Sequence, residues 1–93
     1  NPWPTAYTYY KDKKMKVLKT KILDDYSEKE SGIILNVNDE GIVVSTNDKN
    51  ILIEKIQFPN KRKMSVKDYI NGNEIKEGIK LGGWYKWLIM VVI

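Results

Sequence analysis

The sequence predicts an all-β fold, a small open Greek-key barrel related to the OB fold, with one short helix. Short β-prone runs recur at roughly ten-residue spacing with turn residues between them. One later segment carries a helix-capping signature. The 93 residues, 42% hydrophobic and 30% charged, suit one globular domain with a modest core. These observations exclude a disordered chain and a multidomain one.

The first half of the chain predicts two strands. Residues 6–10 are rich in tyrosine, which favours a strand, and Lys11 opens a short polar connection. Residues 15–23 form the next predicted strand, whose apolar alternation changes phase between Val17 and Leu18. Such a phase change predicts a β-bulge, a device common where a sheet closes into a barrel. Residues 24–31 are polar and predict a loop.

Three further strands are expected before the helix. They cover residues 32–37, 42–46 and 51–58. Residues 38–41 (Asn-Asp-Glu-Gly) predict a hairpin connection, residues 47–50 predict a turn, and Pro59-Asn60 ends the last strand. Ser65 is a candidate N-cap with Asp68 three residues later, so a short helix is predicted over residues 66–70. Residues 73–83 then predict a glycine-containing return.

Composition limits the chemistry of this chain. Cysteine and histidine are both absent, which excludes disulfides, thiolate nucleophiles, Cys/His zinc sites and a histidine general base. The adjacent acids Asp24-Asp25 and Asp39-Glu40 would point to opposite faces of an extended chain, so they predict turns and not an acid/base pair. No glycine-rich phosphate loop is present. We therefore predict no catalytic, metal-binding or cofactor-binding residue in this chain.

Charge is distributed unevenly along the chain. Residues 11–21 contain six lysines and one acid, whereas residues 24–54 contain eight acids and two lysines. Residues 55–67 contain five basic residues and no acid. The net charge of +4 therefore hides two basic clusters, which would make a polarised surface if the fold brings them together. The alternative is that these lysines only solvate exposed strands and edges.

The order of several motifs resembles one known family. The motifs are Pro-Trp-Pro-Thr-Ala-Tyr-Thr-Tyr (2–9), Lys-Lys-Met-Lys-Val (13–17), Gly-Ile-Ile (32–34), Asn-Lys-Arg-Lys-Met-Ser (60–65), Asp-Tyr-Ile-Asn-Gly (68–72) and Ile-Lys-Leu-Gly (79–82). Their order and spacing resemble the C-terminal domain of methionyl-tRNA formyltransferases over residues 2–82. Thr5 departs from the glycine expected at its position in this family.

The resemblance implies that two domains of a longer protein have different roles. In that family a separate N-terminal Rossmann-like domain transfers formyl from 10-formyltetrahydrofolate to methionyl initiator tRNA, and the catalytic residues lie there. The C-terminal domain is an OB-related barrel whose basic face holds the tRNA acceptor arm. By this resemblance residues 1–5 are the arriving linker, residues 6–82 the barrel and residues 83–93 an added apolar tail. The chain would then be the non-catalytic part of a longer cytoplasmic protein.

Candidate tRNA-binding residues follow from the two basic clusters. They are Lys13, Lys14, Lys16, Lys19, Lys21, Lys61, Arg62 and Lys63. Lysine gives phosphate a point charge, and Arg62 is the only residue able to offer a bidentate fork. Lys16, Lys19 and Lys21 could share a face only if the predicted bulge changes the strand phase. Tyr7, Tyr9 and Tyr10 are candidates for stacking on bases, with barrel packing the expected role of at least one.

Other partners remain open at this stage. Residues 84–93, from Trp84 to Ile93, are apolar except for Lys86 and predict an edge strand or a self-association contact, with a non-native extension as the third alternative. The run is too short to span a membrane, so no membrane partner is expected. Three alternative functions are an accessory barrel of a nucleotide-sugar or folate-dehydrogenase formyltransferase, a free-standing single-strand binder, and a structural interaction module.

Overall fold

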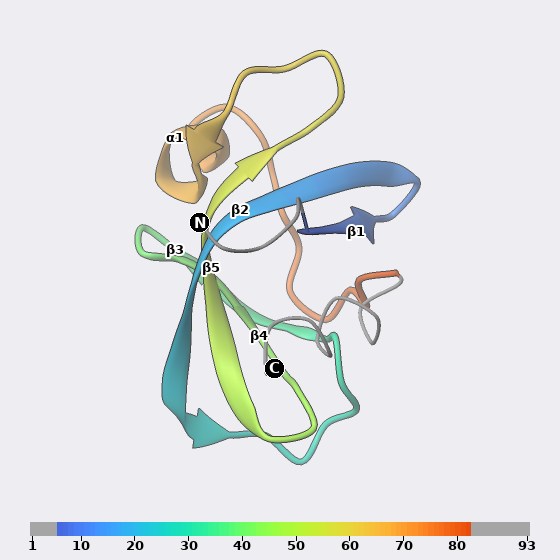
Figure 1. Ribbon diagram of the computed structural model, residues 1–93, viewed down its shortest axis with the longest axis vertical. Coiled ribbons are helices and arrows are strands. Elements are labelled where there is room, and N and C mark those ends of the chain that lie inside the picture. The colour runs from blue at the N-terminus through green and yellow to red at the C-terminus, as the bar shows by residue number, and fades with distance from the viewer. Residues whose placement is uncertain (1–5, 83–93) are drawn as a thin grey trace.

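The computed structural model describes residues 6–82 (Figure 1). It contains six strands and one helix among these residues. The strands are β1 (Ala6–Tyr10), β2 (Lys13–Tyr26), β3 (Ile34–Asn38), β4 (Gly41–Val44), β5 (Lys49–Gln57) and β6 (Met64–Ser65), and the helix is α1 (Val66–Ile70). The predicted linker 1–5 and apolar tail 83–93 lie outside the described residues.

All six strands belong to one antiparallel sheet. The order is β1-β2-β5-β4-β3, with β6 also paired to β5. The long strands β2 and β5 are therefore neighbours although the β3–β4 hairpin separates them in sequence. In the turn of that hairpin, the side-chain oxygen of Asn38 accepts from the backbone N–H of Glu40 (2.8 Å), as the Asn-Asp-Glu-Gly motif predicts. The predicted fold class, a small open all-β barrel with one short helix, is confirmed.

The returning segment after α1 links the two ends of the sheet. On one side the backbone N–H of Ile34 donates to the carbonyl oxygen of Ile79 (3.0 Å). On the other side Tyr9 and Gly82 exchange two backbone hydrogen bonds of 3.1 and 2.8 Å. Because β1 and β3 are the outer strands of the sheet order, this return carries the sheet toward a closed barrel and covers part of both edges.

Strand β2 is longer than the sequence predicts. The polar loop was expected to begin at Asp24, but β2 continues to Tyr26, which pairs with Lys49 of β5. The prediction was wrong here because pairing with β5 satisfies the backbone of these exposed residues whatever their polarity. The same pairing makes β5 begin at Lys49 and not at the predicted Ile51. The predicted bulge is confirmed, since the β2–β5 register shifts between Val17 and Lys19.

The core lies on the inner face of the sheet. Met15, Ile42, Ile53 and Ile56 are fully buried there. The remaining core members come from strands β1 to β5, the residue after β5, the helix and the return, namely Tyr10, Val17, Ile34, Val44, Ile51, Phe58, Val66, Ile75 and Leu81. Ile34 and Val37 would point to opposite faces of a regular strand, yet Ile34 is buried and Val37 also packs against the core. A register shift between Ile34 and Asn36 explains this.

Helix α1 covers the residues predicted for it. The Ser65 side chain accepts a hydrogen bond of 3.1 Å from the backbone N–H of Asp68, as the capping motif predicts. The helix buries Val66 and places the ring of Tyr69 4.9 Å from that of Phe58. Within residues 6–82, no helix has the length and hydropathy required to cross a membrane.

Candidate nucleic-acid interface

The outer face of strands β1, β2 and β5 carries a row of polar and aromatic side chains. Tyr7 of β1 lies opposite Lys16 of β2, and Lys16 lies opposite Gln57 of β5. Tyr9 lies opposite Lys14 in the same way. Directly opposed residues in a sheet project to the same face, so these five side chains share the face that turns away from the core.

The bulge in β2 places further lysines on this face. Lys16 pairs with Gln57 before the bulge, and Lys19 pairs with Lys55 after it. Gln57 and Lys55 are two residues apart on β5, so both project to the same side. In a regular strand Lys16 and Lys19 would face opposite ways, and the extra residue at the bulge removes that conflict.

Lys21 extends the row toward the middle of β2. It is exposed although its partner Leu52 is buried, and its neighbour Thr20 is half-buried and pairs with the core residue Ile53. Lys21 therefore projects away from the core, as Lys16 and Lys19 do. From Lys14 to Lys21 the row extends about 23 Å at the usual rise of a strand.

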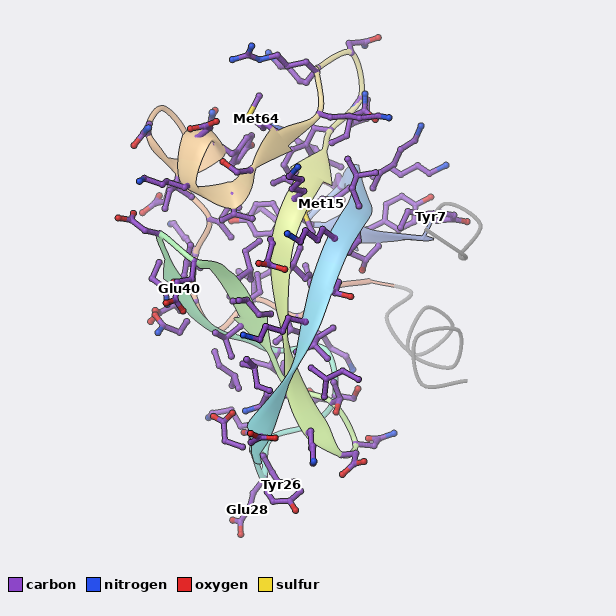
Figure 2. The ribbon with its side chains drawn as sticks, turned by 60° about the vertical axis from the view of Figure 1, so that its left-hand side comes forward. Tyr7, Met15, Tyr26, Glu28, Glu40 and Met64 are labelled. Carbon is purple, nitrogen blue, oxygen red and sulfur yellow. The ribbon has the colours of Figure 1, made fainter. Side chains whose placement is uncertain are left out.

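The second basic cluster lies beside the first. The side-chain nitrogen of Gln57 donates to the backbone carbonyl of Lys61 at 3.0 Å, which fixes the loop after β5 against the outer face. In Figure 2, Met15, which is flanked by Lys14 and Lys16, lies toward the same end of the molecule as Met64, which follows Lys63. All eight basic residues predicted from the sequence are exposed, namely Lys13, Lys14, Lys16, Lys19, Lys21, Lys61, Arg62 and Lys63.

Lys13 occupies a different position from the rest of its cluster. It pairs with Tyr10, whose ring is in the core, and it stands at the start of β2 directly after the Lys11-Asp12 turn. Its register therefore places it out of phase with Lys14 and Lys16. It lies at the rim of the basic face and not within the row.

The three candidate tyrosines separate into two groups. Tyr10 is 7% exposed, and its hydroxyl accepts a hydrogen bond of 3.0 Å from the backbone N–H of Lys76. Its ring belongs to the core, as expected for at least one tyrosine, so it has no free face for a base. Tyr7 and Tyr9 are 45% and 41% exposed and lie on the outer face. Tyr10 is therefore removed from the candidate stacking residues.

Acidic residues gather at the other end of β2. Figure 2 shows Tyr26 and Glu28 at the end of the molecule opposite Tyr7 and Met64. Lysines near that end have acidic neighbours: Lys49 lies 3.8 Å from Asp24, and Lys80 forms a 3.0 Å ion pair with Glu30. Among residues 6–82 the charge is thus polarised, with most of the basic side chains that form no ion pair lying around the start of β2 and the 61–63 loop.

Two residues of the basic face are not among the candidate binding residues taken from the sequence, although Lys55 was counted in the second basic cluster. Lys55 lies between Lys19 and Ser65 in the register, and Gln57 connects Lys16 to the backbone of Lys61. Alternation on β5 could have found them, since Ile56 between them is buried. Their proximity to β2 could not be predicted because the β2–β5 pairing joins segments distant in sequence.

Fold and surface together define a small antiparallel β-barrel module with one strongly basic face. The family described as "Formyl transferase, C-terminal domain" matches residues 1–74 of this chain. The match covers well over half of the sequence, and the chain belongs to this family.

Three relatives of this chain share the name methionyl-tRNA formyltransferase. The chain is 56% identical over 82 residues to a methionyl-tRNA formyltransferase of Clostridioides difficile (strain 630), covering 88% of this chain and 26% of the relative. It is 53% identical over 81 residues to the enzyme of that name from Clostridium acetobutylicum, covering 87% and 26%. For Clostridium beijerinckii the identity is 46% over 81 residues, with the same two shares. The chain thus spans about a quarter of the length of these relatives.

Proposed function

We propose that this chain is the tRNA-binding accessory domain of a methionyl-tRNA formyltransferase-like protein of the cytoplasm. Its basic face holds the acceptor arm of initiator tRNA through phosphate contacts. A separate N-terminal domain transfers formyl from 10-formyltetrahydrofolate, so the chain itself has no catalytic role. The names of its relatives, methionyl-tRNA formyltransferases, support a tRNA substrate over the substrate of a nucleotide-sugar or folate-dehydrogenase formyltransferase.

The single observation that supports this proposal is the grouping of lysines by the β2 bulge. Lys16, Lys19 and Lys21 share one face, and that face adjoins the 61–63 loop. Lysine contacts to phosphate position a nucleic acid without reading its sequence. A barrel of this kind therefore supplies affinity and orientation, while discrimination among tRNAs belongs to the catalytic domain.

A charge-matched comparison tests the proposal. The variant Lys16→Ala/Lys19→Ala/Lys21→Ala removes three charges from the basic face. The control Lys29→Ala/Lys49→Ala/Lys80→Ala removes three charges near the acidic end. Affinity for tRNA is measured by filter binding at several salt concentrations. We expect only the first variant to bind weakly, with a salt slope reduced by about 2 to 3 because each lost phosphate contact removes roughly 0.7 to 0.9.

The second cluster is tested separately. Arg62→Ala/Lys63→Ala should lower tRNA affinity at low salt and reduce the slope by about 1 to 2. Unchanged binding would remove the 61–63 loop from the interface. Equal losses in the basic-face triple variant and in the charge-matched control would show that net charge alone sets the affinity, which contradicts a specific face.

The role of this domain in formylation is tested in the longer protein that would contain it. There the triple variant should raise the KM for methionyl-tRNA in the formylation reaction and leave kcat almost unchanged, because phosphate contacts on a remote domain stabilise the bound substrate and transition state alike. An unaltered KM would favour an accessory barrel without an RNA partner.

A further inference from the structure

We infer that Gln57 is a positioning residue for the basic face. Its side-chain amide holds the loop that carries Arg62 and Lys63, so that these two cations are already in place when a phosphate backbone arrives. This inference rests on the proposed function and makes it more specific. Gln57 acts on the protein backbone and not on the RNA, and its effect reaches the ligand through the loop that it holds.

The loop in question joins two paired strands. Strand β5 ends at Gln57, and β6 begins at Met64, which pairs with Ile56 of β5. Residues 58–63 therefore form the loop of an antiparallel hairpin. Phe58, which is 5% exposed and belongs to the core, anchors its first residue. The last three residues of the loop are basic, namely Lys61, Arg62 and Lys63.

The backbone of Lys61 is fixed on both sides. Its N–H donates to the carbonyl oxygen of Phe58 at 3.1 Å, which closes a turn over Pro59 and Asn60. Its own carbonyl oxygen accepts from the side-chain nitrogen of Gln57 at 3.0 Å. Asn60 has a φ of +61°, a left-handed conformation that asparagine tolerates better than most residues. Turn and amide together define one conformation for this part of the loop.

Arg62 and Lys63 lie between two fixed points. Lys61 before them is held by Gln57, and Met64 after them is paired with β5. Both cations are exposed, and neither forms an ion pair with another residue of the described range 6–82. Their backbone is therefore restrained while their charges stay available to a ligand.

Gln57 is also the point where the two basic clusters meet. It lies opposite Lys16 of β2, and its side chain ends on the backbone of Lys61. A neutral amide joins the clusters without neutralising the neighbouring lysines, as a carboxylate would. A ligand that contacts both clusters at once has to carry several negative charges, which a phosphate backbone does.

A loop that is ordered before binding raises the affinity. Ordering a loop and its side chains at an interface opposes association, and pre-organisation removes part of that cost. A single hydrogen bond shifts such an equilibrium severalfold, and the apparent Kd is inversely proportional to the fraction of molecules in the competent conformation. Loss of the Gln57 bond should therefore weaken tRNA binding about three- to fivefold although every positive charge remains.

The test compares Gln57→Met with a matched control in the full 93-residue chain. Gln57→Met keeps the length of the side chain and removes the donor. The control is Asn73→Leu, because the Asn73 amide donates an exposed bond of 3.1 Å to the backbone carbonyl of Tyr69, with the same four-residue spacing. That bond lies after α1, away from every candidate binding residue. Filter binding of tRNA at several salt concentrations gives affinity and salt slope, and urea unfolding gives stability.

The expected result separates position from charge. Gln57→Met should bind tRNA about three- to fivefold more weakly with an unchanged salt slope, because no charge is lost. Asn73→Leu should leave both quantities unchanged. In the Arg62→Ala/Lys63→Ala background, Gln57→Met should have no further effect, since the loop has then lost both of the cations that Gln57 positions.

A second readout reports on the loop without RNA. The heteronuclear NOE of the Arg62 and Lys63 amides, measured by ¹⁵N relaxation, should fall in Gln57→Met and stay constant in Asn73→Leu. A general loss of folding would lower the urea midpoint and the order of the whole chain. A local loss confined to residues 61–63 is the signature of a positioning residue.

Three results would overturn the inference. Gln57→Met could bind tRNA as tightly as the unaltered chain, or could leave the order of Arg62 and Lys63 unchanged. It could also weaken binding equally in the Arg62→Ala/Lys63→Ala background, which would show that Gln57 acts elsewhere. In each case the proposed function stands if the Lys16/Lys19/Lys21 variant loses tRNA binding, and it fails if that variant does not.

Discussion

The buried hydroxyl of Thr8 donates a 2.6 Å hydrogen bond to the carbonyl oxygen of Gly82, 74 residues further along the chain. This bond joins the first described strand to the end of the returning segment. Leu81 beside it is 1% exposed and contributes to the core. The closure of the barrel at this edge therefore combines apolar burial with a polar contact that only this tertiary arrangement provides.

Replacing Thr8 by valine tests that contact. Thr8→Val keeps the shape of the side chain and removes the donor, so the free energy of unfolding should fall by about 1 kcal/mol. Urea denaturation measures the change. The control is Thr20→Val on the neighbouring strand, because the Thr20 hydroxyl makes no side-chain hydrogen bond within residues 6–82. A loss at Thr20 equal to that at Thr8 would contradict a specific role for the bond.

Gly41 occupies a position in the β3–β4 hairpin where a side chain would not fit. Its φ is +148°, and a Cβ there would lie 2.1 Å from the backbone oxygen of Ile53, which cannot move without disturbing β5. Gly41→Ala should cost well over 2 kcal/mol of stability, since both strain and a backbone clash oppose it. Gly72→Ala is the matched control with nothing within 4 Å of its Cβ, and it should change stability by less than about 0.5 kcal/mol. Thermal unfolding of the two variants compares them directly.

The helix cap gives a third prediction. Ser65→Ala removes the acceptor for the backbone N–H of Asp68 and should destabilise the protein by about 1 kcal/mol. Ser65→Asp retains an acceptor at the same position and should restore most of that stability. Equilibrium unfolding in urea distinguishes the two. If both substitutions cost the same, the cap would not be the source of the effect.

Tyr69 gives a prediction for alkaline pH. Burial raises the pKa of its phenol above the ordinary value of 10.0, and the nearby Tyr10 raises it further. A folded-state pKa above the unfolded one means that the neutral phenol stabilises the fold fully below about pH 10. That contribution is lost as the pH rises through the folded-state pKa. The measurement is the urea midpoint between pH 8 and pH 11.

Tyr69→Phe is the matched change for this prediction, because it keeps the ring against Phe58 at 4.9 Å and removes the titrating group. The decline in stability above pH 10 should be shallower in the variant than in the unaltered chain. Tyr26→Phe, at a 69% exposed position outside the core, is the control substitution. A Tyr69→Phe profile that coincides with that of the unaltered chain would contradict the raised pKa.

Local signals determined much of the architecture. The S-x-x-D motif predicted helix α1 with its observed bounds, because a cap is satisfied by atoms only three residues apart. Likewise the phase change at Val17-Leu18 predicted the β2 bulge, since burial on one face imposes the alternation that the bulge interrupts. The end of β2 could not be predicted in this way: the strand continues to Tyr26 because Lys49 of β5 pairs with that residue, and not because of local propensity.

For the candidate interface, too, some features follow from the sequence and others only from the tertiary structure. Sequence alone determined which residues are basic, that they form two clusters, and that a bulge was required for Lys16, Lys19 and Lys21 to share a face. Only the tertiary structure decided that the clusters adjoin, that Gln57 joins them, and that Tyr10 is buried while Tyr7 and Tyr9 are exposed. The physical reason is that charge and propensity belong to single residues and their neighbours. Adjacency of β2 with β5, and of Tyr9 with Gly82, arises from hydrogen bonds between segments far apart in the chain.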